Sequence, residues 1–120
     1  MLINSKSKRV DGGEMREIKF RAWDILVEYI TYDQVFIYQQ MFKYGKVRGH
    51  TLMQYTGLKD SNNVDIYEGD ILDFIETGGV LRVVKWRDDE AGFNVFKTYM
   101  PDQFRIIGNI HENPELMEGI

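Results

Sequence analysis

Residues 54–72 read QYTGLKDSNNVDIYEGDIL. The stretch holds two glycines, two asparagines, three aspartates, a glutamate and two tyrosines, interleaved with single aliphatic residues. Such a composition suits either an acidic ligand site or a series of tight turns between short strands. The choice between these two readings decides what kind of fold the chain forms.

The most specific acidic ligand site to compare with this stretch is a calcium-binding loop. It needs oxygen ligands at alternating positions, a glycine at position 6 and a glutamate at position 12. Counted from Asp60, position 6 is Asp65 and position 12 is Ile71; counted from Asp65, position 6 is Asp70. The template fails in both registers, so the sequence favours turns.

The turn reading divides this stretch into short extended runs. Asp and Asn bond their own backbone and Asn tolerates positive φ, so 59–63 and 68–70 are predicted turns. We expect strands at 51–55, 64–67 and 71–75, with Thr56-Gly57 ending the first of them.

The whole chain has the composition of a single soluble domain. It has 120 residues, 43% of them hydrophobic and 28% charged, with a net charge of −4. It contains no cysteine, which excludes disulfides, thiolate catalysis and Cys-ligated zinc. The longest apolar runs are far shorter than the roughly 18 residues that span a bilayer, so we expect no membrane association and a cytoplasmic location.

The N-terminal residues differ from the rest. Residues 1–14 show no core-forming pattern, and we expect a disordered extension there, with Met15 as the native start and a single domain over 15–120. From 16 to 23 the chain alternates: Ile18, Phe20 and Ala22 face one side, while the polar residues and Trp23 face the other. This period of two predicts a strand with one buried face. On its polar side, we expect Trp23 to cover a neighbouring strand or the end of the barrel.

The remaining segments predict further short elements. Residues 33–44 are ambiguous between strand and helix; Asp33 as a cap and the helical spacing of Val35, Tyr38 and Phe42 favour a short helix. Gly78-Gly79 suits a two-residue hairpin loop. The other predictions are strands at 29–32, 80–86, 93–99 and 105–110, a charged loop at 87–92, and a single helical turn after Asn113-Pro114.

These elements amount to seven or eight short strands and predict a mostly β barrel or sandwich. Four segments, MREIKFRAWD (15–24), LMQYTGLKD (52–60), IYEGDI (66–71) and IGNIHENPEL (107–116), resemble the YopX family of bacteriophage and prophage proteins. The resemblance covers most of 15–118 with the segments in the family's order. It implies a small β-pseudobarrel of antiparallel strands capped by one short helix, and it implies no molecular activity.

The sequence carries no signature of an enzyme. The P-loop, dinucleotide-binding, HExxH and GxSxG patterns do not occur. His50 and His111 are the only histidines, and each reads as an ordinary surface residue. The acidic run Asp88-Asp89-Glu90 reads as a solvated loop. We therefore expect a non-enzymatic protein without metal or cofactor.

Two functions then remain open. The first is a homo-oligomeric protein-interaction module that engages a host or phage protein through exposed aromatics such as Trp23 and Tyr29. The second is an accessory nucleic-acid-binding protein, because Arg82, Lys85 and Trp86 follow one another on a predicted strand. The candidate binding residues are Arg21, Trp23, Asp24, Tyr55 and Tyr67 from the motif segments, together with Arg82 and Trp86.

Overall fold

The computed structural model describes residues 17–96 and 99–119, so the predicted extension at 1–14 and the Met15 start lie outside the described residues. In this part of the chain, nine strands and one α-helix, α1 (Gln34–Tyr44), follow one another with short 3-10 turns between them. The strands are β1 (Phe20–Asp24), β2 (Tyr29–Thr31), β3 (His50–Lys59), β4 (Asp65–Tyr67), β5 (Asp70–Phe74), β6 (Leu81–Val83), β7 (Trp86–Arg87), β8 (Gly92–Phe93) and β9 (Phe104–Asn109). The predicted mostly β fold with one short helix is confirmed.

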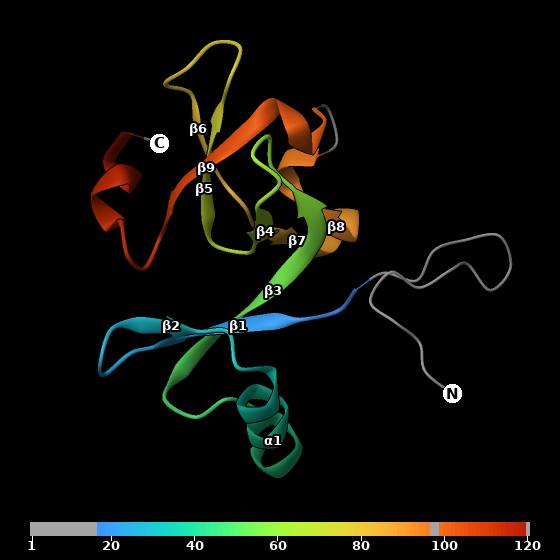
Figure 1. The fold of residues 1–120 in the computed structure, drawn as a ribbon, viewed down its shortest axis with the longest axis vertical. Coiled ribbons are helices and arrows are strands. Elements are labelled where there is room, and N and C mark those ends of the chain that lie inside the picture. Colours follow the sequence, from blue (N-terminus) through green and yellow to red (C-terminus); the bar gives the residue numbers. More distant parts are fainter. Residues whose placement is uncertain (1–16, 97–98, 120) are drawn as a thin grey trace, which may run out of the picture.

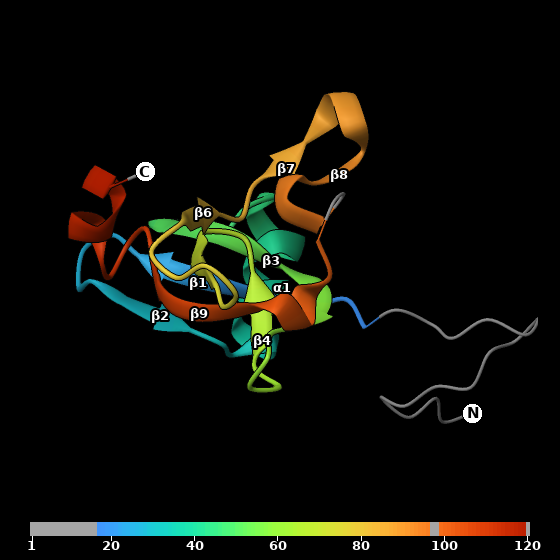
Figure 2. The ribbon, with the colours of Figure 1, turned by 90° about the horizontal axis from the view of Figure 1, so that it is seen from above.

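Two antiparallel sheets form the body of the molecule. The first has the order β2-β1-β3-β4 and the second the order β6-β5-β9. Strand β3 is long enough to pass from the first sheet toward the second, so the strands curl into a half-barrel with α1 at the end away from β5 and β9 (Figure 1). The two-stranded β7-β8 sheet projects as a separate arm, which is clearest from above (Figure 2).

The prediction that Thr56-Gly57 ends the strand is wrong. Strand β3 continues through both residues, and its pairing with β4 shifts register between Tyr55 and Lys59. Gly57 takes a φ of 87°, which glycine adopts without strain, so the chain bulges and bends there instead of stopping. The turns at 59–63 and 68–70 are present, with Asn63 at a φ of 64°.

The segment 80–99 also departs from the prediction. The expected strand 80–86 breaks after Val83, and of the expected partner strand 93–99 the described residues pair with β7 at Phe93 alone. The loop between β5 and β6 is longer than two residues, because Asp73 pairs with Leu81; both of its glycines take positive φ.

Strand β1 is covered on both faces. Ala22 is fully buried against Ile37 of α1, as its alternation predicts. The opposite face, predicted to be polar and exposed, places Arg21 only 4% exposed between the sheets. Ile18, predicted to be buried, precedes the strand and is 63% exposed.

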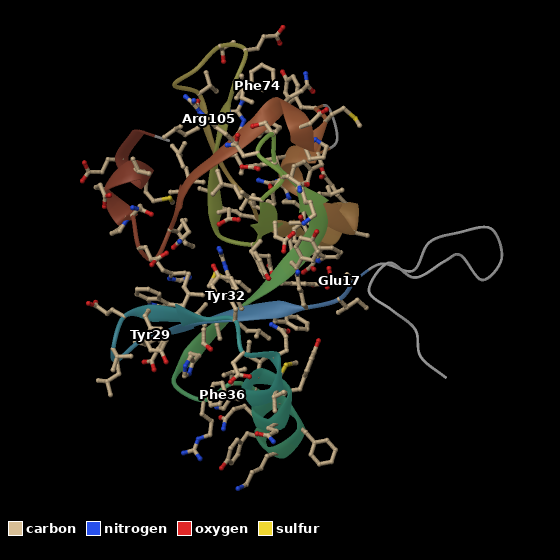
Figure 3. All side chains as sticks on the ribbon, viewed as in Figure 1. Glu17, Tyr29, Tyr32, Phe36, Phe74 and Arg105 are labelled. Atoms are coloured by element: carbon tan, nitrogen blue, oxygen red, sulfur yellow. The ribbon has the colours of Figure 1, made fainter. Side chains whose placement is uncertain are left out.

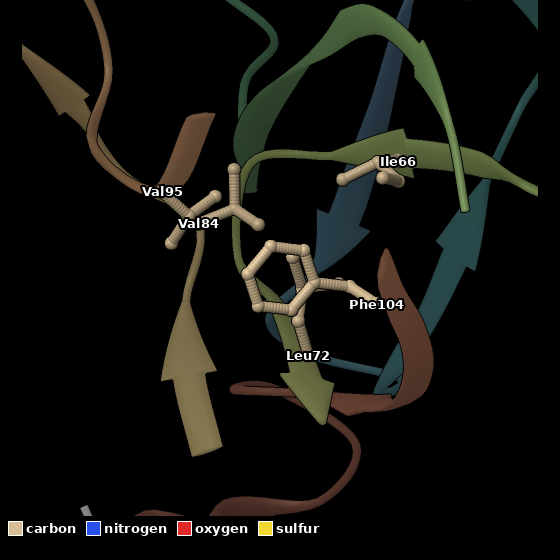
Figure 4. Close-up of a cluster of buried hydrophobic side chains, with 5 residues drawn as sticks. All are labelled: Ile66, Leu72, Val84, Val95 and Phe104. Carbon is tan, nitrogen blue, oxygen red and sulfur yellow. The ribbon is translucent and has the colours of Figure 1, made fainter. Parts of the chain in front are cut away.

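Helix α1 forms where the capping signal predicts it. The Asp33 side chain accepts a hydrogen bond from the Phe36 amide at 3.1 Å, and Gly45 ends the helix at a φ of 72°. Its inner face packs Ile37, with Phe36 and Met41 beside it, onto β1. A second core cluster lies under β5 and β9 and contains Ile66, Leu72, Val84, Val95 and Phe104 (Figure 4). No helix in the described residues is both long enough and apolar enough to cross a membrane.

Candidate functional site

The two sheets are separated by a cleft of about 680 Å³, which we call the inter-sheet cleft. Its size falls in the range of pockets that hold small ligands. The residues that line it are Lys19, Arg21, Tyr32, Gln34, Val64, Asp65, Tyr67, Asp70, Ile106, Gly108, Asn109, Glu112 and Asn113. Most of them belong to or adjoin the motif segments, so the fold brings distant parts of the sequence to one place.

Arg21 is the centre of the inter-sheet cleft. Its Nη2 lies 2.8 Å from Asp70 Oδ1 and donates to the carbonyl of Glu68 at 3.1 Å. Its guanidinium stacks 4.7 Å above the Tyr67 ring, and Nη1 reaches the Tyr32 hydroxyl at 3.4 Å. Tyr32 lies on the side of its sheet that faces β5 and β9 (Figure 3). These contacts join β1 to the β4–β5 turn across the cleft.

The Asp70 carboxylate is fully engaged by the protein. One oxygen binds Arg21 and the other accepts the Tyr67 amide at 2.7 Å. Burial raises the pKa of Asp70, and the Arg21 charge and the Tyr67 amide counteract that rise. This carboxylate therefore links Arg21 of β1 to the Tyr67 amide at the end of β4.

Lys19 and Asp65, two further charged residues of the cleft, are paired as well. Lys19 lies 2.8 Å from Asp65, and Lys59 binds the same carboxylate. Tyr55 is buried beside this pair, and desolvation raises its pKa to about 12, so its hydroxyl stays protonated at neutral pH. Among the described residues, no group of three His, Asp or Glu side chains is arranged to hold a metal ion.

The C-terminal motif closes one end of the cleft. Asn109 Oδ1 accepts the amides of His111 and Glu112, and Asn113 Oδ1 accepts the Asn109 amide at 3.1 Å. The Asn113 side chain leaves no room for a side chain at Gly108, where a Cβ would stand 2.5 Å from its oxygen. The helical turn predicted after Asn113-Pro114 is present as a 3-10 helix at Pro114–Gly119, whereas the turn before it, which these side-chain amides shape, was not predicted.

Trp23 and His111 stack across the same end. Their ring centroids are 5.3 Å apart and the rings are nearly parallel, at 15°. Of the two predicted positions for Trp23, over a neighbouring strand or over the barrel end, this stack on the turn after β9 fits the second; with the indole half-buried, its role in an exposed patch stays a prediction. Burial, with the Arg21 charge adding to it, lowers the pKa of His111, so this histidine is not the ordinary surface residue predicted.

Asp24 holds the tip of the β1–β2 hairpin. Its Oδ1 accepts the amides of Leu26 at 2.9 Å and Val27 at 3.1 Å, and its other oxygen lies 3.5 Å from His50. The Val27 amide holds the pKa of Asp24 below its usual value, with the Leu26 amide and His50 adding to the effect. This candidate residue therefore organises a turn outside the cleft.

Neither Arg82 nor Trp86 lines the cleft, and the two residues lie on different strands. Arg82 is exposed on β6, while Trp86 is 46% exposed on the β7-β8 arm, packed edge-on against Phe93. The indole N–H donates to Asp88 at 2.8 Å, and Arg87 binds Asp89. The expected strand is broken between Val83 and Trp86, which separates Arg82 from Trp86, and neighbouring acids bind Trp86 and Arg87.

Sequence reasoning missed Lys19, Asp65, Asp70 and Asn109 as cleft residues. Asp65 lies in a predicted strand and Asp70 in a predicted turn, and the partners Lys19 and Arg21 that bring them into the cleft are far away in sequence. The alternation of β1 correctly predicted that Arg21 and Trp23 share one face of the strand. In the structure that face points toward the cleft.

The comparisons agree with this architecture of a mostly β half-barrel with one helix. The model of the YopX protein family matches residues 19–118, and the chain belongs to this family. Protein EF1440 from Enterococcus faecalis has a similar solved structure, with a TM-score of 0.60 and 25% sequence identity, covering 86% of this chain and 99% of that one. Among curated proteins, none matches the sequence significantly.

Proposed function

We propose that the protein is a non-enzymatic protein-interaction module that presents the tip of its β1–β2 hairpin to a partner. Ile25, Leu26 and Val27 are three consecutive aliphatic residues in a surface turn, and Leu26 is 89% exposed. Turn chemistry alone favours Gly, Asn, Asp or Ser at such positions. Apolar side chains displayed on a turn instead mark a surface that another protein covers.

The tip is held in one conformation before any partner arrives. Asp24 accepts two amides of the turn, the Ile25 amide donates to Gly49 at 3.1 Å, and Glu28 takes a φ of 59° to close the hairpin. A preorganised turn loses less conformational entropy on binding than a free loop. The three aliphatic side chains fit an apolar pocket on a different protein.

The cellular location and the kind of partner are also proposed. Membership of a family of phage and prophage proteins supports a role in the cytoplasm of a bacterial cell, with a host or phage protein as the partner. We propose that the protein is not an enzyme because, in the inter-sheet cleft, the carboxylates of Asp65 and Asp70 are already bound by Lys19, Lys59 and Arg21.

Site-specific photo-crosslinking in the natural host tests this proposal. A benzophenone amino acid at position 26 is expected to give one discrete adduct, whose partner is identified by mass spectrometry. The same probe at Ile75, an exposed aliphatic in the β5–β6 loop, is the matched control. Identical adducts from both positions, or none from position 26, would overturn the proposal.

Nucleic-acid binding is the second candidate, and one observation favours it. Between Asp33 and Asp60 the chain has no acidic residue but carries Lys43, Lys46, Arg48 and Lys59. The Tyr44 ring lies 4.7 Å from Arg48 and 5.3 Å from Lys43, which combines basic groups with an aromatic face. Fluorescence anisotropy with single- and double-stranded DNA at two salt concentrations tests it, and no binding at low salt would rule it out.

A further inference from the structure

We propose that the second sheet carries a binding site for a small aryl carboxylate, a molecule with one aromatic ring and one carboxylate group. The site is a pocket of about 180 Å³, which we call the ring pocket. Among the described residues, it shares no lining side chain with the inter-sheet cleft or the hairpin tip. The residues that line it are Phe74, Thr77, Val80, Arg82, Tyr99 and Phe104.

Three aromatic rings enclose the ring pocket. Phe74, the last residue of β5, lies in the half of the molecule away from α1 (Figure 3). Its ring centroid is 4.8 Å from that of Tyr99 and 5.4 Å from that of Phe104, and the Tyr99 and Phe104 centroids are 6.0 Å apart. Phe104 is 2% exposed and belongs to the second core cluster, so the floor of the pocket is fixed by the core. Rings arranged at these distances favour a further aromatic ring in tilted or edge-on contact.

The volume of the ring pocket fits a single ring. Pockets that hold drug-sized ligands measure about 300–1,000 Å³, which is well above the 180 Å³ found here. An apolar cavity of about 150 Å³ in another protein binds benzene. The ring pocket therefore has room for one aromatic ring with a short substituent, and it is too small for a nucleotide.

Arg82, one of the candidate binding residues from the sequence, supplies a charge at this pocket. Three of the other arginines that the structure describes are paired with aspartates, and Arg48 lies 4.7 Å from the ring of Tyr44. Arg82 forms no ion pair with a carboxylate of the described residues; it contacts the carbonyl of Leu81 at 3.4 Å, which is a long hydrogen bond. A guanidinium with its donors uncommitted binds a carboxylate through two parallel N–H groups.

These two features together define the chemical class of the ligand. The ring of an aryl carboxylate occupies the space among the three aromatic side chains, and its carboxylate meets Arg82, the one charged residue among those that line the pocket. A neutral ring would leave the guanidinium without a partner, and a cation would be repelled by it. A carboxylate attached to the ring satisfies both the apolar interior and the charge.

An NMR titration of the full chain with phenylacetate tests the proposal. Ligands of this size bind in the micromolar to millimolar range, so the probe is raised to about 10 mM. We expect saturable shifts at the methyl groups of Val80 and Thr77, because the ring current of the bound probe acts on nearby protons. The methyl groups of Leu26, on the hairpin tip, should not shift.

Arg82→Met tests the role of the charge. The substitution keeps an apolar chain at an exposed position, and it should weaken phenylacetate binding at least tenfold. The neutral analogue phenylacetamide should bind wild type at least tenfold more weakly than phenylacetate does, and Arg82→Met should leave its affinity unchanged. Lys85→Met is the matched control, since it removes a nearby exposed charge that does not line the pocket.

Val80→Phe tests the pocket itself. Val80 is 40% exposed, so a larger side chain there can occupy the pocket without displacing the core. This variant should bind neither phenylacetate nor phenylacetamide, while thermal unfolding confirms that it stays folded.

Three outcomes would overturn the proposal. The first is the absence of saturable shifts at Val80, and the second is an equal affinity of wild type and Arg82→Met for phenylacetate. The third is unchanged binding in folded Val80→Phe, which would place the probe elsewhere on the protein. The ring pocket and the hairpin tip are tested by different probes, so either proposal can fail without the other.

Discussion

The guanidinium of Arg21 on β1 lies 2.8 Å from the carboxylate of Asp70 on β5, and both side chains are almost completely buried. This pair crosses the space between the two sheets, where Tyr67 contacts both residues. It connects two motif segments through residues that are 49 positions apart in sequence. The pair therefore explains why these segments occur together: they join the two halves of the fold.

Removing one member of this pair should destabilise the protein strongly. Asp70→Asn leaves the Arg21 charge buried without its counter-ion, which typically costs about 3–5 kcal/mol. Urea unfolding followed by far-UV circular dichroism measures the loss. The double variant Arg21→Met with Asp70→Asn should lose less than the sum of the two single changes, and strict additivity would show that the residues act independently.

Gly108→Ala should destabilise the C-terminal motif. The new methyl group would stand 2.5 Å from Asn113 Oδ1, which accepts the Asn109 amide, so the turn must shift. We expect a cost of about 1–3 kcal/mol in thermal or chemical unfolding. Gly92→Ala is the matched control, since its Cβ would meet nothing nearer than 3.7 Å. Equal effects of the two substitutions would contradict the packing described.

His111 should make stability depend on pH. Its pKa is lowered in the folded state by burial and by Arg21, so the unfolded chain binds the proton more readily. Stability should therefore fall as pH decreases from about 7.5 through the ordinary histidine pKa of about 6.5. His111→Phe keeps the stack on Trp23 without a titrating group. The variant should show a smaller loss of stability at acidic pH than wild type; identical pH profiles would refute the assignment.

Asp60 should act through the backbone and not through a metal ion. Its carboxylate accepts the amides of Asn62 and Val64 in the turn and of Ile106 on β9. Asp60→Ala leaves three amides without a partner, at about 1–3 kcal/mol each if they stay buried. Calcium at millimolar concentration should leave the melting temperature unchanged. A rise in melting temperature that Asp60→Ala abolishes would restore the ligand-site reading of residues 54–72.

The local elements could largely be predicted from the sequence. Alternation gave β1, the cap at Asp33 gave α1, and Asn63 marked a turn, because each signal acts over a few neighbouring residues. The bulge at Gly57 and the break after Val83 could not be predicted, since they depend on which strand pairs with which. The inter-sheet cleft also depends on pairing between distant segments. From the sequence Asp70 is predicted as a turn residue, and only the folded position of β1 brings Arg21 beside it.

The same limit applies to the surface. Residue type alone made Trp23 and Arg82 candidate binding residues, and only the fold shows that the first is half-buried and that the second lies on a different strand from Trp86. Leu26 and Phe42 carried no motif, and an aliphatic residue in a turn or a phenylalanine in a helix is indistinguishable from core in a single sequence. Exposure can be assigned only once the sheets and α1 are assembled.

The most direct test of the account is the affinity of the crosslinked partner, purified and titrated by calorimetry against wild type and Leu26→Asp. We expect Leu26→Asp to bind the partner at least tenfold more weakly than wild type and to keep the same melting temperature, because Leu26 lies on the surface and contributes to binding, not to the core. Equal affinity of the two proteins for the partner would contradict the claim that the hairpin tip is the binding surface.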